Sequence, residues 1–154
     1  MQFSSKEDIE IPIGEAFALL SDFHGLERSA IRRGIDVRRR PEPSQGGEGL
    51  TWDAAFDMRG KRREATITLA EYDPPNAMRF DTGFQGLDCQ MHVTLFELSQ
   101  RRTRMGVVLN MKPKTMSGRL FLQSLKLAKA SLNKRFKLKV ADYVRVLELR
   151  RRQA

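Results

Sequence analysis

The sequence has a single cysteine, a single tryptophan and no long apolar run. With Cys89 as the only cysteine, no disulfide can form within the chain, and a helix that crosses a bilayer would need roughly 18 consecutive apolar residues. Residues 1–8 lack the basic start and the apolar stretch of a secretory signal peptide. These absences argue against a disulfide-rich secreted fold and against a helical membrane span. We therefore expect one domain, residues 1–154, in the reducing cytoplasm.

Residue sets that would support catalysis or metal binding are also missing. His24, His92 and Cys89 are far apart in the sequence and lack the spacing of metal ligands, so we predict no metal site and no cofactor. Asp53 and Asp57 share one face of a strand pattern whose other face is apolar, and we expect both carboxylates to point to water. No nucleophile with a nearby base is found. We therefore assign no catalytic residue, and an enzyme is less favoured than a binding protein.

Positive charge is unevenly distributed along the chain. The net charge is +9, yet residues 1–27 contain one lysine and six acids, net −5, and residues 112–154 contain thirteen bases and two acids, net +11. Five bases of the last segment form a candidate basic surface, namely Arg119, Lys126, Lys134, Lys137 and Arg145. This surface is either an ordinary solvated helix face or a site for an anionic partner, with membrane, nucleic acid and acidic protein as the open alternatives.

The middle of the chain alternates apolar and polar residues, a pattern typical of strands that bury one face. Strand patterns cover residues 3–11, 35–37, 50–58, 64–69, 78–84, 89–95 and 105–111. Two short helices are expected after the first strand, over 12–20 and 24–33, and residues 41–47 are expected to form a loop because they are rich in proline and glycine. Short turns between successive strands predict an antiparallel meander.

Residues 115–152 contain no proline and one glycine, Gly118, and predict one long helix. At 1.5 Å per residue this helix would be on the order of 50 Å long, so it would lie across a broad surface. Its apolar stripe consists of Phe121, Leu125, Ala128, Leu132, Phe136, Val140, Tyr143 and Leu147. We expect this helix to cover the sheet and to enclose a cavity with it.

Three short motifs accompany this order of elements. They are Ile9, Glu10, Ile11, Pro12, Ile13, Glu15, Ala16 and Phe17; Gly49, Leu50 and Trp52; and Asp73, Pro74 and Pro75 followed by Arg79 and Phe80. With the terminal helix, they make nearly the whole chain resemble the START-like (helix-grip, SRPBCC) superfamily, specifically its bacterial polyketide cyclase/dehydrase and lipid-transport branch. The resemblance implies an α+β helix-grip fold: a curved antiparallel sheet of about six or seven strands wrapped around a long C-terminal helix, with two short helices after the first strand.

The resemblance also implies an apolar pocket between sheet and helix, which in relatives holds sterols, lipids, polyketides, quinones or plant hormones. The candidate cavity residues are Trp52, Phe56, Met58, Phe80, Phe84, Met91, Met105, Phe121, Leu125, Leu132 and Phe136. Core packing explains many of them, but methionine and aromatic side chains together are typical of walls that hold apolar ligands. The leading hypothesis is binding or transport of a small hydrophobic ligand, such as a lipid, a quinone or a polyketide-like molecule. Arg79 or Asp81 would orient its polar head group at the rim.

Two alternative functions stay open. A small cyclase or dehydratase would use the same pocket to fold a reactive chain, while one polar residue moves a proton. Association with an anionic surface, such as a membrane, an RNA or a ribosome, would use the basic C-terminal helix. Nucleic acid is the least favoured partner because the aromatic residues Phe121, Phe136 and Tyr143 fall on the apolar side of that helix.

Overall fold

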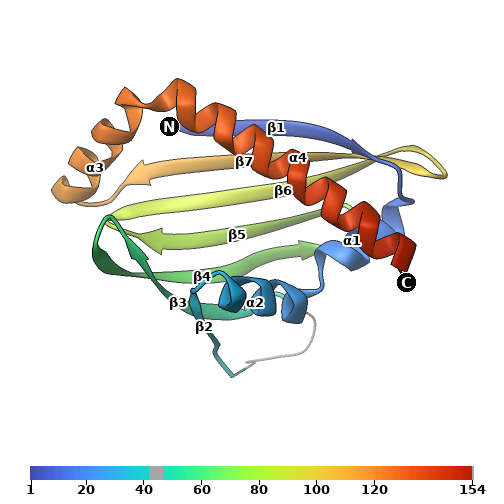
Figure 1. Ribbon diagram of the computed structural model, residues 1–154, viewed down its shortest axis with the longest axis horizontal. Coiled ribbons are helices and arrows are strands. Elements are labelled where there is room, and N and C mark those ends of the chain that lie inside the picture. The colour runs from blue at the N-terminus through green and yellow to red at the C-terminus, as the bar shows by residue number, and fades with distance from the viewer. Residues whose placement is uncertain (42–46, 154) are drawn as a thin grey trace.

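The computed structural model describes residues 1–41 and 47–153 (Figure 1). In chain order the elements are β1 (Gln2–Ile9), α1 (Ile13–Leu20), α2 (Phe23–Arg32), β2 (Asp36–Arg39), β3 (Thr51–Met58), β4 (Lys61–Asp73), β5 (Ala77–Phe84), β6 (Leu87–Ser99), β7 (Arg102–Pro113), α3 (Met116–Leu127) and α4 (Lys129–Gln153). The predicted strands and the two predicted short helices are confirmed. Residues 42–46 of the predicted loop lie outside the described residues.

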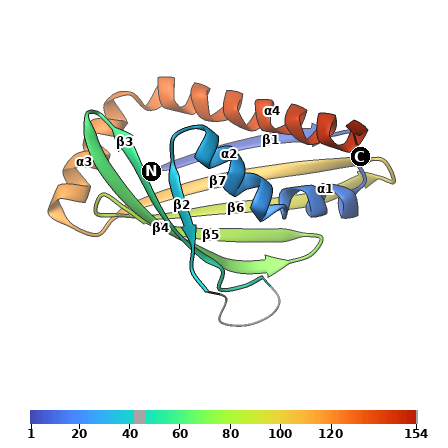
Figure 2. The ribbon, with the colours of Figure 1, turned by 60° about the horizontal axis from the view of Figure 1, so that its bottom comes forward.

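The strands form an antiparallel sheet of seven in the order β1-β7-β6-β5-β4-β3-β2, as far as the chain is described. Strands β2 to β7 follow one another as a meander, and β1 pairs with β7 at the edge. The register shifts in β4 between Leu69 and Glu71 and in β6 between Glu97 and Ser99. Such irregularities bend a strand and increase its twist, so the sheet is curved (Figure 2). The predicted antiparallel meander and its curvature are confirmed.

The strands alternate between a buried and a wet side, as their sequence pattern predicts. In β3, Trp52 is 6% exposed, whereas the Asp53 carboxylate lies 2.8 Å from the Arg40 guanidinium at the surface. The Asp57 carboxylate, also exposed, lies 3.6 Å from Arg62. Both acids therefore face water, as predicted.

Helices α1, α2 and α4 lie over the same face of the sheet (Figures 1 and 2). Helix α4 runs along the edge strand β1 and reaches α1, whereas α2 lies next to β2, the strand at the opposite edge of the sheet. The side chains of Ile9, Phe17 and Leu147 are buried together where these elements meet. On this one face, α4 therefore covers the part of the sheet near the edge strand β1, and α2 covers the part near the edge strand β2.

Acids near the N-terminus pair with bases at the end of α4. Arg150 pairs with Asp22, and Arg151 pairs with Glu15. Asp22 is also the N-cap of α2, since its Oδ1 accepts a hydrogen bond from the Gly25 N–H at 3.0 Å. That hydrogen bond, with the nearby Arg150 guanidinium, lowers the pKa of the Asp22 carboxyl. One carboxylate thus joins the start of α2 to the end of α4.

The predicted single helix over 115–152 is wrong, because the segment forms two helices that meet at Ala128 (Figure 1). Ala128 has φ −109° and ψ 20°, and its N–H donates to the Leu125 carbonyl at 3.0 Å, which closes α3 in a tight turn. The Leu132 N–H donates to the Ala128 carbonyl at 2.9 Å and so begins α4. Ala and Lys around the break favour helix, so tertiary contacts of α3 have overridden local propensity.

The contact that fixes α3 is made between two glycines. Gly86 has φ +72° in the turn between β5 and β6, and its carbonyl accepts a hydrogen bond from the Lys114 N–H at 2.8 Å. Gly118 lies directly against the Gly86 backbone, where no Cβ would fit. The Thr115 Oγ1 caps the helix by accepting from the Gly118 N–H at 2.9 Å. The start of α3 is therefore held on the turn between β5 and β6.

We expect Gly118→Ala to destabilise the protein by about 1–3 kcal/mol, because the new methyl group would overlap the Gly86 carbonyl and displace α3. Urea unfolding followed by circular dichroism measures the change. Gly14→Ala in α1 is the matched control, since no atom lies within 4 Å of the added Cβ and the change should be neutral or stabilising by up to about 1 kcal/mol. Equal effects of the two substitutions would contradict the assigned contact.

Candidate functional site

A cavity of about 720 Å³ lies between the buried face of the sheet and helices α2 and α4. Ligand sites in proteins commonly measure about 300–1,000 Å³ and are mainly apolar. Protein interiors otherwise contain few voids larger than a water molecule. The volume is therefore too large to be a packing defect.

Clusters of buried side chains adjoin this cavity. The first gathers residues of α1 and the end of α4, including Phe17 and Leu147, against the sheet, and it continues into the cavity wall at Trp52 and Met105. The second consists of Phe3, Leu87, Met111 and Leu122, where α3 meets β1, β6 and β7.

Most residues predicted for the cavity lie in its wall. These are Trp52, Phe56, Phe80, Phe84, Met91, Met105 and Phe136. The strand residues among them follow from the period of two in β3, β5, β6 and β7, which sends every second side chain to the same face. Their rings also contact each other: the centroids of Phe56 and Phe84 are 5.6 Å apart, and those of Trp52 and Phe80 are 6.4 Å apart.

Four predicted residues, Met58, Phe121, Leu125 and Leu132, do not line the cavity. Met58 ends β3 and pairs with Lys61 across the hairpin, beyond the cavity.

The other three, Phe121, Leu125 and Leu132, pack against the second cluster instead. The prediction placed them along one straight helix, but the chain turns at Ala128, and α3 packs against β7 and β6. Phe121 comes closest to the predicted role, since its ring centroid lies 6.1 Å from that of Phe84 in the wall.

Helix α2 contributes wall residues that the sequence analysis did not identify. Phe23, Leu26 and Ala30 of α2 line the cavity, yet no residue of α2 is fully buried. The apolar spacing of three and four residues in this helix is the signal that could have found them. The apolar face of α2 remains partly exposed because it faces the cavity.

The polar groups of the wall are few. Glu27 accepts two hydrogen bonds from Arg39, at 3.1 Å and 2.8 Å, so its carboxylate is already engaged. Lys139 and Tyr143 reach the cavity from α4, and burial raises the pKa of the Tyr143 phenol. The indole N–H of Trp52 is buried and has no hydrogen-bond partner within the described part of the chain. The wall therefore offers hydrogen-bond donors against a largely apolar background.

The predicted role of Arg79 and Asp81 at the rim is wrong. Within β5, Met78 and Phe80 point into the cavity, so Arg79 and Asp81 lie on the opposite face of the sheet. There the Arg79 guanidinium donates to the Asp81 carboxylate at 2.9 Å and also pairs with Glu71. Neither residue can orient a ligand inside the cavity.

The described residues contain no cluster of three or more His, Cys, Asp or Glu side chains that could hold a metal ion. Within the same residues, none of the helices combines the length and the apolar character needed to cross a membrane.

No protein-family model and no curated protein matches this sequence. Solved structures are similar in fold. A protein of Thermus thermophilus aligns over 97% of this chain and 96% of its own, with a TM-score of 0.62 and 15% identity. The Zhui aromatase/cyclase of Streptomyces sp. R1128 aligns over 75% of this chain and 69% of its own, with a TM-score of 0.58 and 14% identity.

A third similar structure is an HSP90 activator of Plasmodium falciparum, which aligns over 75% of this chain and 76% of its own, with a TM-score of 0.52 and 14% identity. One architecture thus serves an aromatase/cyclase and an HSP90 activator, so it identifies no activity by itself. The predicted arrangement of a curved antiparallel sheet with a long C-terminal helix is confirmed. The chain has the α+β helix-grip fold.

Cys89 in the cavity wall should react slowly with thiol reagents. Burial, followed by the neighbouring Asp88 carboxylate, raises the pKa of the Cys89 thiol above its ordinary value of 9.0, so at about pH 8 it holds less thiolate than a free cysteine. We expect its reaction with dithionitrobenzoate to be at least about tenfold slower in the folded protein than in urea, and to accelerate as the pH rises above 9.0. Equal rates in the folded and unfolded protein would contradict this environment.

Proposed function

We propose that this protein binds a small, mainly apolar ligand in the cavity between the sheet and helices α2 and α4. The observation that carries this proposal is the combination of about 720 Å³ of space with a wall built from aromatic, methionine and aliphatic side chains. Leaving such a wall in contact with water is unfavourable, and an apolar ligand would remove that contact. Burial of about 300 Å² of apolar surface would contribute about 7 kcal/mol, before the entropy lost on association.

The wall favours a flat ligand with a small number of hydrogen-bond acceptors. Aromatic rings from α2, β3 and β5 are in contact in the wall, since the ring centroid of Phe23 in α2 lies 5.6 Å from Trp52 in β3 and 6.4 Å from Phe80 in β5. Rings stack well on flat ring systems. The Tyr143 hydroxyl and the Lys139 ammonium are donors that suit a carbonyl or a hydroxyl oxygen. A quinone or a polyketide-like ring system fits these features better than a flexible acyl chain.

A second candidate function is a cyclase or dehydratase that acts on such a molecule. Tyr143 in the wall favours it, because burial raises the pKa of this phenol and keeps it protonated, as a proton donor requires. The one carboxylate among the described wall residues, that of Glu27, is held by Arg39 and is not free to act as a base. We therefore favour binding or transport over catalysis. Loss of turnover with retained binding in Tyr143→Phe would favour the enzyme.

Trp52 provides a direct readout, because it is the only tryptophan of the chain and lies in the cavity wall. We expect a naphthoquinone and an anthraquinone to quench its fluorescence saturably, with one binding site and a dissociation constant in the range of about 1–10 μM. Oleic acid tests the flexible-chain alternative. Native mass spectrometry of the protein as purified would identify a bound molecule. Linear, non-saturating quenching by every probe would refute the proposal.

Val107→Phe should weaken binding of the naphthoquinone by at least about tenfold, because the larger side chain would fill part of the cavity. Thermal stability should be unchanged or higher, since the added ring enters empty space rather than a packed core. Val108→Phe is the matched control, because Val108 is the next residue of β7 and points to the opposite face of the sheet. Equal affinities of the two variants would show that the probe binds elsewhere.

A further inference from the structure

Helix α3 is apolar on two opposite sides. One side packs Phe121, Leu122 and Leu125 against the second cluster. The other side carries Met116, Leu120 and Leu127, which are 71%, 60% and 92% exposed. Spacings of four and seven residues place these three on a single stripe of the helix. The outer stripe therefore adds nothing to the core.

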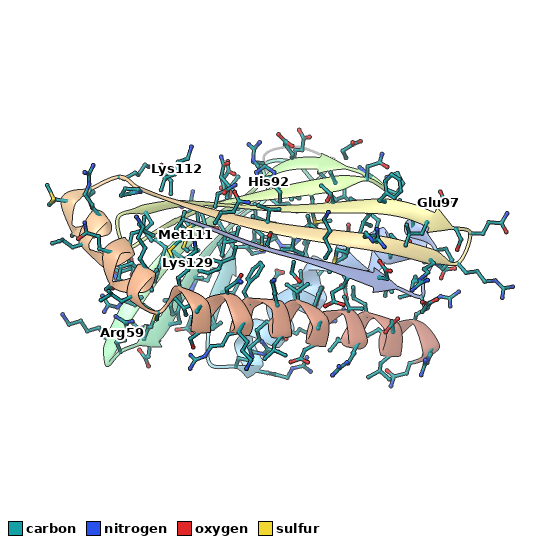
Figure 3. The ribbon with its side chains drawn as sticks, turned by 90° about the horizontal axis from the view of Figure 1, so that it is seen from above. Arg59, His92, Glu97, Met111, Lys112 and Lys129 are labelled. Atoms are coloured by element: carbon teal, nitrogen blue, oxygen red, sulfur yellow. The ribbon has the colours of Figure 1, made fainter. Side chains whose placement is uncertain are left out.

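Bases lie beside this outer stripe and at the same end of the molecule. Arg119 and Lys126 belong to α3 itself, and Lys129 begins α4. Lys112 lies at the end of β7. Arg59, in the turn between β3 and β4, lies towards the inner side of α3, since its guanidinium is 5.9 Å from the Phe121 ring centroid. Figure 3 shows Arg59, Lys112 and Lys129 at the end of the molecule that carries α3. Within residues 1–41 and 47–153, none of these bases forms an ion pair.

The other end of the molecule is electrically different. There Arg150 and Arg151 of α4 pair with Asp22 and Glu15. Within the described part of the chain, Arg119 and Lys126 of α3 form no ion pair, and neither do Lys134 and Lys137 in the middle of α4. The predicted basic surface is divided between two helices. Arg119 and Lys126 lie on α3, and Lys134, Lys137 and Arg145 lie on α4.

We propose that the outer face of α3 docks on the surface of an anionic lipid bilayer. Met116, Leu120 and Leu127 would enter the boundary between headgroups and acyl chains, while Arg119 and Lys126 contact lipid phosphates. Exposed apolar residues rimmed by lysine and arginine are the combination that interfacial helices use. The position of α3 also matters for the cavity, because Phe121 on its inner side contacts Phe84 in the wall.

Two other occupants fit the surface less well. A nucleic acid would stack its bases on exposed aromatic rings, whereas the outer stripe holds methionine and leucine and Phe121 faces inwards. A second copy of the chain, paired symmetrically through this face, would bring like charges together. Charge complementarity therefore favours the anionic bilayer.

Vesicle co-sedimentation tests the proposal without any cavity ligand, so its result is independent of the proposed function. We expect the protein to bind vesicles of phosphatidylcholine mixed with phosphatidylglycerol and to stay in solution with phosphatidylcholine alone. The double substitution Arg119→Gln with Lys126→Gln should weaken binding about thirtyfold, because each base near an anionic surface contributes roughly fivefold. Leu120→Gln with Leu127→Gln should weaken it at least about tenfold.

Matched controls come from exposed positions of α4. Leu138 and Leu149 are 55% and 53% exposed, and Lys134 and Lys137 are exposed bases. The pairs Leu138→Gln with Leu149→Gln and Lys134→Gln with Lys137→Gln should each leave binding within about threefold of the unmodified protein. All these substitutions are at the surface, so thermal stability should stay nearly unchanged and separate lost binding from lost folding.

Several outcomes would overturn the proposal. The first is failure of the unmodified protein to bind the anionic vesicles. The second is an equal loss in the α3 and α4 variants, which would assign binding to diffuse charge. The third is full binding by the leucine variant of α3, which would exclude insertion of the stripe. A concentration-dependent dimer that only the α3 leucine variant abolishes, or salt-sensitive binding of RNA in place of vesicles, would assign the surface to one of the other partners.

Discussion

The width of the sheet is the constraint on which the rest of the structure depends. Seven strands spaced by about 4.8 Å span roughly 29 Å, whereas one helix with its side chains is only about 10 Å across. Helix α4 therefore covers the sheet near its edge strand β1, and α2 covers the same face near the opposite edge strand, β2. Between the central strands and these two helices the side chains leave a space of about 720 Å³. The cavity is the direct result of this mismatch in width.

The placement of charge follows from the same architecture. Because α4 must run the length of the sheet, its C-terminal end comes to the acidic segment that begins the chain, and Arg150 and Arg151 are neutralised there. The bases near the start of the C-terminal segment meet no comparable group of acids. The uneven charge of the sequence, net −5 over residues 1–27 and net +11 over residues 112–154, is thus partly neutralised where the two segments meet.

Much of the fold and of the cavity wall could be predicted from the sequence, because the alternation of apolar and polar residues in a strand shows which of its faces is buried. The wall residues of β3, β5, β6 and β7 follow from it, and the same alternation should have placed Arg79 on the outer face. The break at Ala128 could not be predicted, since the residues around it favour helix, and the contact between Gly86 and Gly118 that holds the start of α3 joins residues far apart in the sequence. Phe121, Leu125 and Leu132 were misplaced for that reason.

The double role of Asp22 determines how the cavity can widen. Its carboxylate starts α2 and is also bound to Arg150 of α4, so the two helices that border the opening share one fixed point. At the far end of α2 the chain passes through Gly34, at φ +87°. Glu27 in the middle of α2 is also bound to Arg39 of β2, so moving α2 away from the cavity would require this ion pair to break or β2 to move with the helix.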